Sequence, residues 1–291
     1  MSSNRFVATA CALALLVVQT ACARPDPANP ALWHVEGPKG QSAWLFGTIH
    51  ALSRPAAWRT PRVEQALGKS DELLVEIADL NNDDATREIY DQLAHSPGQP
   101  PIENRVRPDL RASLMHLVDK AGLKPGSFAD TETWAAALML SHVAQGPDED
   151  AANGVDRDLL KSTRLLVGEL EGTRKQLGLF DTLPESAQRA MLESVVTDAP
   201  HALQETQQLA RAWRQGDMGW IERQTQGGML ANPVLRNVLY VRRNLAWSEA
   251  IKQAMAQGRH PFVAVGAAHM AGAQGLPALL AAKGYRVTRV E

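Results

Sequence analysis

The sequence of 291 residues contains only two cysteines, Cys11 and Cys22, and both lie near its start. If that segment is removed, the remaining chain has no cysteine, which excludes disulfide bonds and thiolate chemistry. The sequence also lacks any long basic run, and its formal net charge is only −2. Nucleic acid is therefore not an expected partner.

Two local signatures of hydrolases are also missing from the sequence. It contains neither the His-Glu-x-x-His pattern of many zinc peptidases nor the Gly-x-Ser-x-Gly elbow of serine hydrolases. A catalytic site, if there is one, must therefore be assembled from residues that are far apart in the sequence. The length and the hydrophobic content of 45% suit one large globular domain over residues 24–291.

The first 23 residues have the composition of a signal peptide. Arg5 provides the positive charge, residues 6–18 the apolar stretch, and Ala21, Cys22 and Ala23 a cleavage site of the A-x-A type. The apolar stretch is too short for a comfortable membrane span. We expect an exported protein, periplasmic or secreted, that begins at Arg24 and has no transmembrane span after cleavage.

The alternative is a lipoprotein in which Cys22 carries the lipid anchor. Gln19 argues against this alternative, because lipoprotein signals usually have leucine at that position.

Two short segments, far apart in the sequence, share one design. Trp44 to His50 and Phe262 to His269 each contain an apolar run, then a glycine, and then a histidine three residues later. An apolar run of this length is typical of a strand buried on both faces. The glycines, Gly47 and Gly266, allow a turn or a close approach of the backbone. Ligands bind at the carboxyl ends of strands in open α/β sheets, so both histidines are candidate site residues, although core or capping roles are equally consistent with the pattern.

The order of the remaining segments predicts an α/β (α+β) fold. Strands are expected at 31–36 and 42–49, joined by a hairpin, and at 73–77 after a short helix that begins at Pro61. The C-terminal end adds strands at 262–267 and 285–290 around a helix. Between them, residues 83–257 are mostly helical, with one small strand near 165–170. We therefore predict a mixed central sheet built from both ends of the chain, with a large helical insertion that either packs on the sheet or forms its own lobe.

This topology would bring His50 and His269 together, with Glu76 nearby in an apolar strand. Two imidazoles and a carboxylate form a recurrent binding set for a divalent metal ion. A carboxylate in an apolar strand is costly unless it is paired or binds a metal, so Glu76 either belongs to a site or to a structural ion pair. Arg243 lies on one helical stripe with Tyr240 and Trp247, where it either stacks between aromatic rings or binds an anionic group.

Together, these segments resemble the TraB/GumN family, which includes the Tiki proteases of animals. The resemblance is carried by the paired Gly-x-x-His motifs, by Leu-Trp-x-Val at 32–35, by Val-Glu-Ile at 75–77, by Arg243-Asn244 and by the segment 262–272, and it extends from about Ala31 to Val290. Asp156 and Glu171 match acidic positions of the family pattern. Each either orients a ligand histidine or donates a proton, or it is a solvent-exposed helix residue without a role in the site.

The resemblance implies a hydrolase of peptide or protein substrates that uses a divalent ion such as Mn²⁺, Co²⁺ or Zn²⁺. The implied metal ligands are His50, Glu76 and His269, with Glu76 or Glu171 as general base, Arg243 and Asn244 near the reacting group and Asp156 behind a ligand. A second possibility is a haem- or metal-binding module related to ChaN-like proteins, and a third is an accessory protein without catalysis.

Overall fold

The computed structural model describes residues 24–291. The predicted signal peptide, its cleavage site and the alternative of lipidation at Cys22 lie outside the described residues. Within the described range, no helix is both long enough and apolar enough to cross a membrane.

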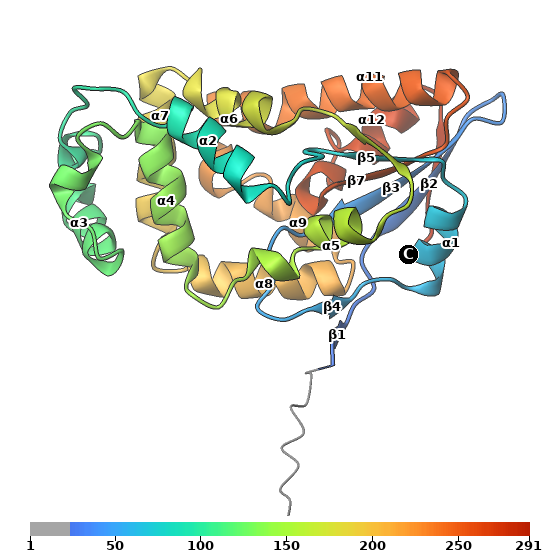
Figure 1. Ribbon diagram of the computed structural model, residues 1–291, viewed down its shortest axis with the longest axis horizontal. Helices are drawn as coiled ribbons and strands as arrows, with labels where there is room; N and C mark the ends of the chain where they lie inside the picture. Colours follow the sequence, from blue (N-terminus) through green and yellow to red (C-terminus); the bar gives the residue numbers. More distant parts are fainter. Residues whose placement is uncertain (1–23) are drawn as a thin grey trace, which may run out of the picture.

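A six-stranded mixed sheet forms the centre of the molecule (Figure 1). The strand order is β6-β5-β7-β3-β2-β8, in which the first four strands are parallel to one another and β2 is antiparallel to both of its neighbours. Strands from both ends of the chain therefore lie side by side, as predicted. The bounds are β2 Leu32–Glu36, β3 Ser42–Thr48, β5 Glu72–Val75, β6 Leu166–Glu169, β7 Pro261–Gly266 and β8 Arg286–Arg289, and a separate parallel pair joins β1 Asp26–Pro27 to β4 Ala56–Ala57.

Helices connect and cover these strands. The sequence places their ends by local chemistry: Thr60 caps α1 by accepting from the Val63 N–H, with Pro61 at the first helical position. The α-helices are α1 Pro61–Gly68, α2 Asp83–Leu93, α3 Arg111–Lys120, α4 Thr133–Gln145, α5 Val155–Ser162, α6 Thr173–Asp181, α7 Glu185–Asp198, α8 Ala202–Arg214, α9 Met218–Gln224, α10 Pro233–Arg236, α11 Arg242–Ala256 and α12 Leu276–Ala282.

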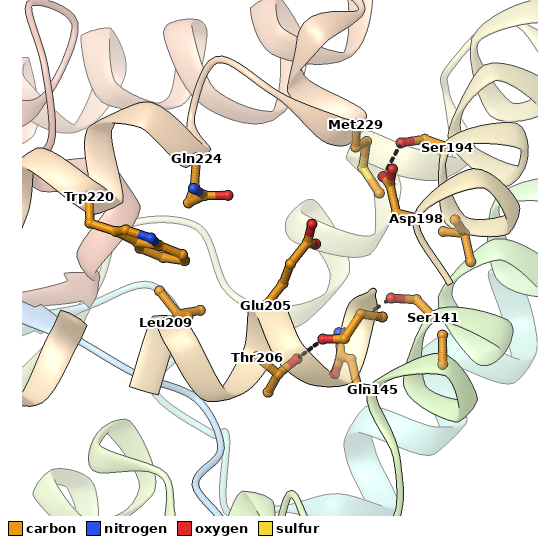
Figure 2. Close-up of a pocket in the computed structure, with 13 residues that line it drawn as sticks. Ser141, Gln145, Ser194, Asp198, Glu205, Thr206, Leu209, Trp220, Gln224 and Met229 are labelled. Atoms are coloured by element: carbon orange, nitrogen blue, oxygen red, sulfur yellow. Dashed lines mark hydrogen bonds between the residues drawn. The ribbon is translucent and has the colours of Figure 1, made fainter. Parts of the chain in front are cut away.

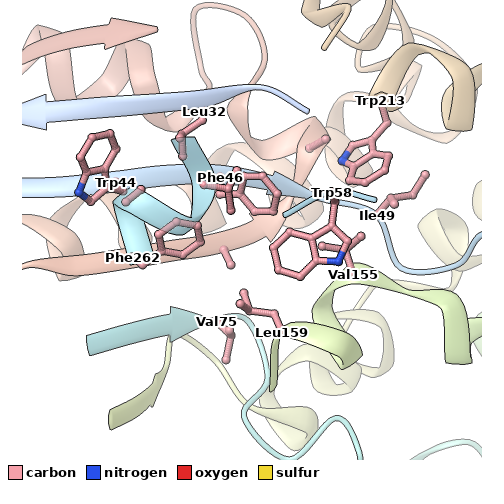
Figure 3. Close-up of a cluster of buried hydrophobic side chains, with 14 of the residues drawn as sticks. Leu32, Trp44, Phe46, Ile49, Trp58, Val75, Val155, Leu159, Trp213 and Phe262 are labelled. Carbon is pink, nitrogen blue, oxygen red and sulfur yellow. The ribbon is translucent and has the colours of Figure 1, made fainter. Parts of the chain in front are cut away.

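Each face of the sheet packs against a different set of helices. On one face, alternate side chains such as Phe46 and Phe262 contact residues of α1, α5 and α8, including Val63, Leu159 and Trp213 (Figure 3). The intervening residues, such as Val263, point to the other face and pack on α11 and α12. This two-sided burial explains why β3 and β7 are continuous apolar runs rather than alternating ones.

The helices of the insertion form a second core of their own. Buried side chains from α3, α4 and α7, among them Leu114, Leu140 and Met191, cluster apart from the two clusters that line the sheet. In Figure 1 these helices lie to one side of the sheet. The insertion is therefore divided: α3, α4 and α7 share a core of their own and are called the helical lobe below, whereas α5, α8 and α11 pack on the sheet.

Three details of the architecture differ from the predictions or add to them. β5 ends at Val75, so Glu76 lies one residue beyond the strand and not inside it. β5 is parallel to β3 but is not hydrogen-bonded to it, because β7 lies between them. The last helical stretch of the insertion, residues 233–256, contains a π-helical segment, Asn237–Val241, between α10 and α11. Such segments are often found at functional sites, and this one ends two residues before Arg243.

Candidate functional site

The carboxyl ends of three neighbouring parallel strands meet at one edge of the sheet. Thr48 at the end of β3 pairs with Gly266 at the end of β7, and Val75 of β5 pairs with Ala264. The segments that follow these ends carry His50, His269 and Glu76. Both histidines line one cavity of about 310 Å³. The topology thus collects the three predicted ligands at the edge where ligands bind in α/β sheets.

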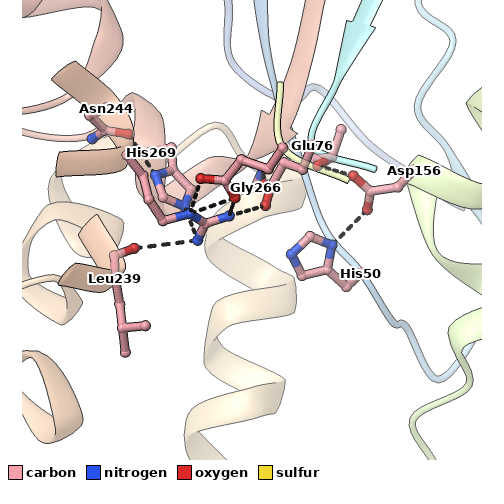
Figure 4. A network of polar contacts seen from close by, with 10 residues as sticks. His50, Glu76, Asp156, Leu239, Asn244, Gly266 and His269 are labelled. Atoms are coloured by element: carbon pink, nitrogen blue, oxygen red, sulfur yellow. Dashed lines mark hydrogen bonds and ion pairs between the residues drawn. The ribbon is translucent and has the colours of Figure 1, made fainter. Parts of the chain in front are cut away.

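His50 is oriented by Asp156, which lies in the first turn of α5. Its Nδ1 is 2.9 Å from Asp156 Oδ2, and Asp156 also accepts a hydrogen bond from the Thr48 hydroxyl (Figure 4). The Asp156 charge and hydrogen bond outweigh burial and raise the pKa of His50 to about 9. Because the His50 side chain is 65% exposed, solvent screens part of this attraction. The pairing leaves Nε2 of His50 on the side of Gly266 and Glu76.

His269 is held by a different partner and in a drier environment. Its Nδ1 lies 2.6 Å from Asn244 Oδ1, while the Asn244 amide donates to the Gln274 carbonyl at 2.8 Å. This second bond fixes the amide orientation, so Nδ1 of His269 is the donor and Nε2 carries the free electron pair. The ring packs between Tyr240 and Trp247. Burial lowers the pKa of His269 to about 3, against the opposing effect of Glu76, so the ring is neutral at pH 7.

Glu76 lies between the two histidine segments and uses both carboxylate oxygens. Oε1 accepts from the Gly266 N–H at 2.8 Å, and Oε2 accepts from Nη2 of Arg243 at 2.7 Å. Burial by itself would raise the pKa of Glu76, but the neighbouring His269, His50 and Arg243 side chains and the bond from Gly266 lower it overall. Arg243 and His50 retain their charge when His269 is neutral, so Glu76 is ionised at pH 7.

Arg243 is the centre of the polar network. Its guanidinium binds Glu76, contacts both oxygens of Glu171 at 3.0 and 3.2 Å through Nε, and lies 3.3 Å from His269 Nε2 through Nη1. It also lies over the Trp247 ring, with 4.6 Å to the centroid. Arg243 therefore stacks on one aromatic ring, and its donors are engaged by carboxylates of the protein itself. Binding of a substrate carboxylate or an oxyanion by Arg243 stays a prediction.

The two motif glycines serve different purposes. A Cβ atom at Gly47 would come within 3.0 Å of the Ala267 backbone, so this glycine permits the close approach of the two histidine segments. A Cβ atom at Gly266 would point into the site, 3.3 Å from His50 Nε2 and 3.5 Å from Glu76 Oε1. Gly266 has an ordinary backbone conformation, with φ of −47°. Its small size is therefore needed for space in the site and not for the turn itself.

Every residue predicted for the site lies in this network: the three presumed ligands, the second carboxylate Glu171, the Arg243-Asn244 pair and Asp156. Sequence reasoning missed Thr48 and Trp213. Thr48 is inside the first Gly-x-x-His motif, so its place was available from the sequence. Trp213 of α8 donates to the Gly47 carbonyl at 2.8 Å and anchors the turn before His50. No local pattern connects residues 166 positions apart.

The network can be compared with the requirements of the divalent ion that the family resemblance implies. Each histidine has Nδ1 fixed by an oxygen acceptor, which is the usual support of metal-binding histidines. Among residues 24–291, however, no three His, Cys, Asp or Glu side chains lie close enough together to hold a metal ion. The guanidinium of Arg243 contacts both Glu76 and His269. The types of donor atom fit a divalent ion, but the positions of the side chains do not form a metal site.

A comparison with protein families gives a match over nearly the whole chain. The model of the TraB/PrgY/gumN family matches residues 31–289. No match was found among curated proteins or among solved structures. The matched range contains every strand of the six-stranded sheet and every residue of the polar network. The chain therefore belongs to the TraB/PrgY/gumN family.

Proposed function

We propose that the protein is a metal-dependent hydrolase that cleaves peptide or protein substrates. The observation that supports this most directly is the matched support of the two histidines. His50 and His269 come from separate strands, yet each has Nδ1 held by a dedicated acceptor. Nε2 of His50 lies on the side of Gly266 and Glu76, and Nε2 of His269 contacts Arg243, which binds the same Glu76. Structural histidines in a core need no such paired arrangement at the open edge of a sheet.

In this proposal His50, His269 and Glu76 hold the ion. A bound divalent ion supplies a water molecule that is reactive at neutral pH and polarises the carbonyl of the substrate. Asp156 and Asn244 keep the two imidazoles in the tautomer that exposes Nε2. Arg243 uses its donors on Glu76, Glu171 and His269, so these contacts favour a role in positioning the carboxylates. Arg243 can bind a developing oxyanion only if it breaks one of these three contacts.

Hydrolysis also needs a group that takes a proton from the attacking water and passes it to the leaving nitrogen. Glu76 and Glu171 are the carboxylates of the network. Glu76 lies beside the histidines, whereas Glu171 contacts them only through Arg243. Glu171→Gln and Glu76→Gln can be compared for metal content and for turnover. The residue whose substitution reduces turnover without loss of metal is the base.

The proposal is tested by digestion of a peptide library with the purified exported protein, with and without Mn²⁺, Co²⁺ or Zn²⁺. We expect cleavage only when an ion is added, and none with His50→Ala or His269→Ala, whose thermal melts should stay close to that of the parent protein. An absorbance spectrum of the protein reconstituted with haem tests the alternative. Haem binding that needs both histidines, without peptide cleavage by any ion, would replace the hydrolase with a binding module.

A further inference from the structure

A second cavity adjoins the one that contains the two histidines. Its volume is about 260 Å³, and it shares Gln145 of α4 and Thr206 and Leu209 of α8 with the histidine cavity. A substrate that lies across His50 and His269 therefore has a neighbouring compartment within the helical part of the chain. The other lining residues come mainly from α7, α9 and the segment before α10, and include Ser194, Asp198, Glu205, Trp220, Gln224 and Met229.

The charge of this second cavity is of one sign. Asp198 and Glu205 both line it, and Figure 2 shows Glu205 projecting between Trp220 on one side and Asp198 on the other. Among the described residues that line either cavity there is no lysine or arginine. Glu205 has no ion-pair partner within the described part of the chain, and Asp198 accepts only a neutral hydrogen bond, from Ser194 at 3.0 Å. The negative charge is thus not balanced inside the cavity.

The rest of the lining favours an organic cation over a hydrated ion. Trp220, Leu209 and Met229 provide apolar contacts for a methylene chain, and the face of an indole ring attracts ammonium and guanidinium groups. The polar groups Gln224 and Thr206 can accept hydrogen bonds from such a group. A carboxylate on a ligand would meet two like charges and would be repelled.

We propose that this second cavity binds a positively charged ammonium or guanidinium group of the peptide substrate, and that Asp198 and Glu205 make the protein select basic peptides. That the ligand is a peptide rests on the proposed function. The cation comes from a lysine or arginine side chain or from a free amino terminus, which present the same chemistry to the cavity.

The test is calorimetric binding of three peptides to the full exported chain, kept free of divalent ions so that nothing is cleaved. The probes are acetyl-Ala-Lys-Ala-amide, its norleucine analogue, and the norleucine peptide with a free amino terminus. We expect the lysine peptide to bind about ten-fold more tightly than the acetylated norleucine peptide, from two ion pairs and one cation–π contact. Equal binding of the free-amine peptide would identify the amino terminus as a second source of the cation.

The preference should fall to within about two-fold in the double variant Asp198→Asn, Glu205→Gln, since both cation contacts weaken. Asp119→Asn is the matched control, because it removes one charge from an exposed position of α3 and should leave the preference unchanged. Glu205 is itself exposed, so Glu205→Lys should fold, and the new positive charge beside Asp198 should abolish the preference for the lysine peptide. Equal affinity for lysine and norleucine peptides in the parent protein, or a preference that survives the double variant, overturns the inference.

Failure of this inference can be told apart from failure of the proposed function. Cleavage that depends on a divalent ion but not on lysine would leave the hydrolase standing without the selective cavity. Preferential binding of the lysine peptide without cleavage by any ion would leave the cavity standing without the hydrolase.

Discussion

At the scale of single residues, the space between His50 and Glu76 depends on one missing side chain. Gly266 donates its N–H to Glu76, and any Cβ at this position would lie 3.3 Å from His50 Nε2. Its φ of −47° is accessible to every residue. The site therefore requires the absence of a side chain at position 266, whereas the backbone conformation does not.

We expect Gly266→Ala to leave the free energy of unfolding within about 1 kcal/mol of the parent value, because its backbone angles suit alanine. The added methyl group should instead reduce metal affinity and peptide cleavage by at least about ten-fold, a loss of the size seen when ligand support is disturbed. Gly178→Ala, in open space on α6, is the control and should change neither property of the site. Unaltered metal binding in Gly266→Ala would show that the ion lies elsewhere.

The His50–Asp156 pair should make stability depend on pH in the metal-free protein. His50 has a pKa of about 9 in the folded chain and about 6.5 when unfolded, so its contribution is full below pH 6.5 and is lost as the pH rises toward 9. The loss should be about 1 kcal/mol or less, because the side chain is exposed and screened. The lowered pKa of His269 changes the free energy of unfolding only below pH 6.5, so it does not contribute between pH 6.5 and pH 9.

Urea unfolding at pH 6.5 and at pH 9.5, with a chelator present, measures this effect. Asp156→Asn should remove the difference that is due to His50. The same decline in both proteins between these two pH values would assign it to other groups.

At the scale of elements, α8 fixes the turn that delivers His50. Trp213 is buried, packs with Phe46 and Trp58 in the cluster on one face of the sheet, and donates to the carbonyl of Gly47. The π-helical segment 237–241 supports the other histidine, because it places the Tyr240 ring against the His269 imidazole. The two histidines are thus supported from different helices.

Trp213→Phe should keep most of the packing and lose the hydrogen bond, which leaves the Gly47 carbonyl unpaired and costs about 1–3 kcal/mol. Cleavage should fall together with stability, because the His50 turn loses its anchor. Trp58→Phe is the comparison, since Trp58 donates to Asp158 on the exposed side of α5 and not to the site. If both variants lose activity equally, general packing and not the Gly47 contact is responsible.

Much of the element pattern could be predicted because its causes are local. Thr60 before Pro61 begins a helix, and the apolar runs before Gly47 and Gly266 form buried strands, all within a few residues of the signal. The insertion of β7 between β3 and β5 could not be predicted, because it depends on contacts between the two ends of the chain. The same holds for Arg243, whose helix was expected but whose contact with His269 depends on side-chain conformation.

At the scale of the whole molecule, the sheet and the helical lobe have separate cores. The lobe core includes Leu140, whereas Val263 belongs to the core beside α11 and α12. The second cavity lies where α4, α7 and α8 meet. If this cavity binds the cationic group of a substrate, the lobe contributes to substrate selection. Lobe and sheet are expected to open separately, since regions with distinct cores often unfold as distinct units.

Leu140→Ala should cost about 2–5 kcal/mol, as buried leucine truncations do, and should speed amide hydrogen exchange in α3, α4 and α7 more than in β3 and β7. Val263→Ala should show the opposite distribution. Uniform acceleration across the chain in both variants would mean that the molecule unfolds as one unit.

The central claim, that His50, His269 and Glu76 hold one divalent ion, is tested most directly by elemental analysis. The purified protein should be incubated with Mn²⁺, Co²⁺ or Zn²⁺, freed of unbound ion, and analysed beside His50→Ala, His269→Ala and, as a control, His116→Ala on α3. The account predicts one ion per chain in the parent protein and in His116→Ala, and none in the two site variants. Equal metal content in all four proteins, or no ion in any of them, would contradict it.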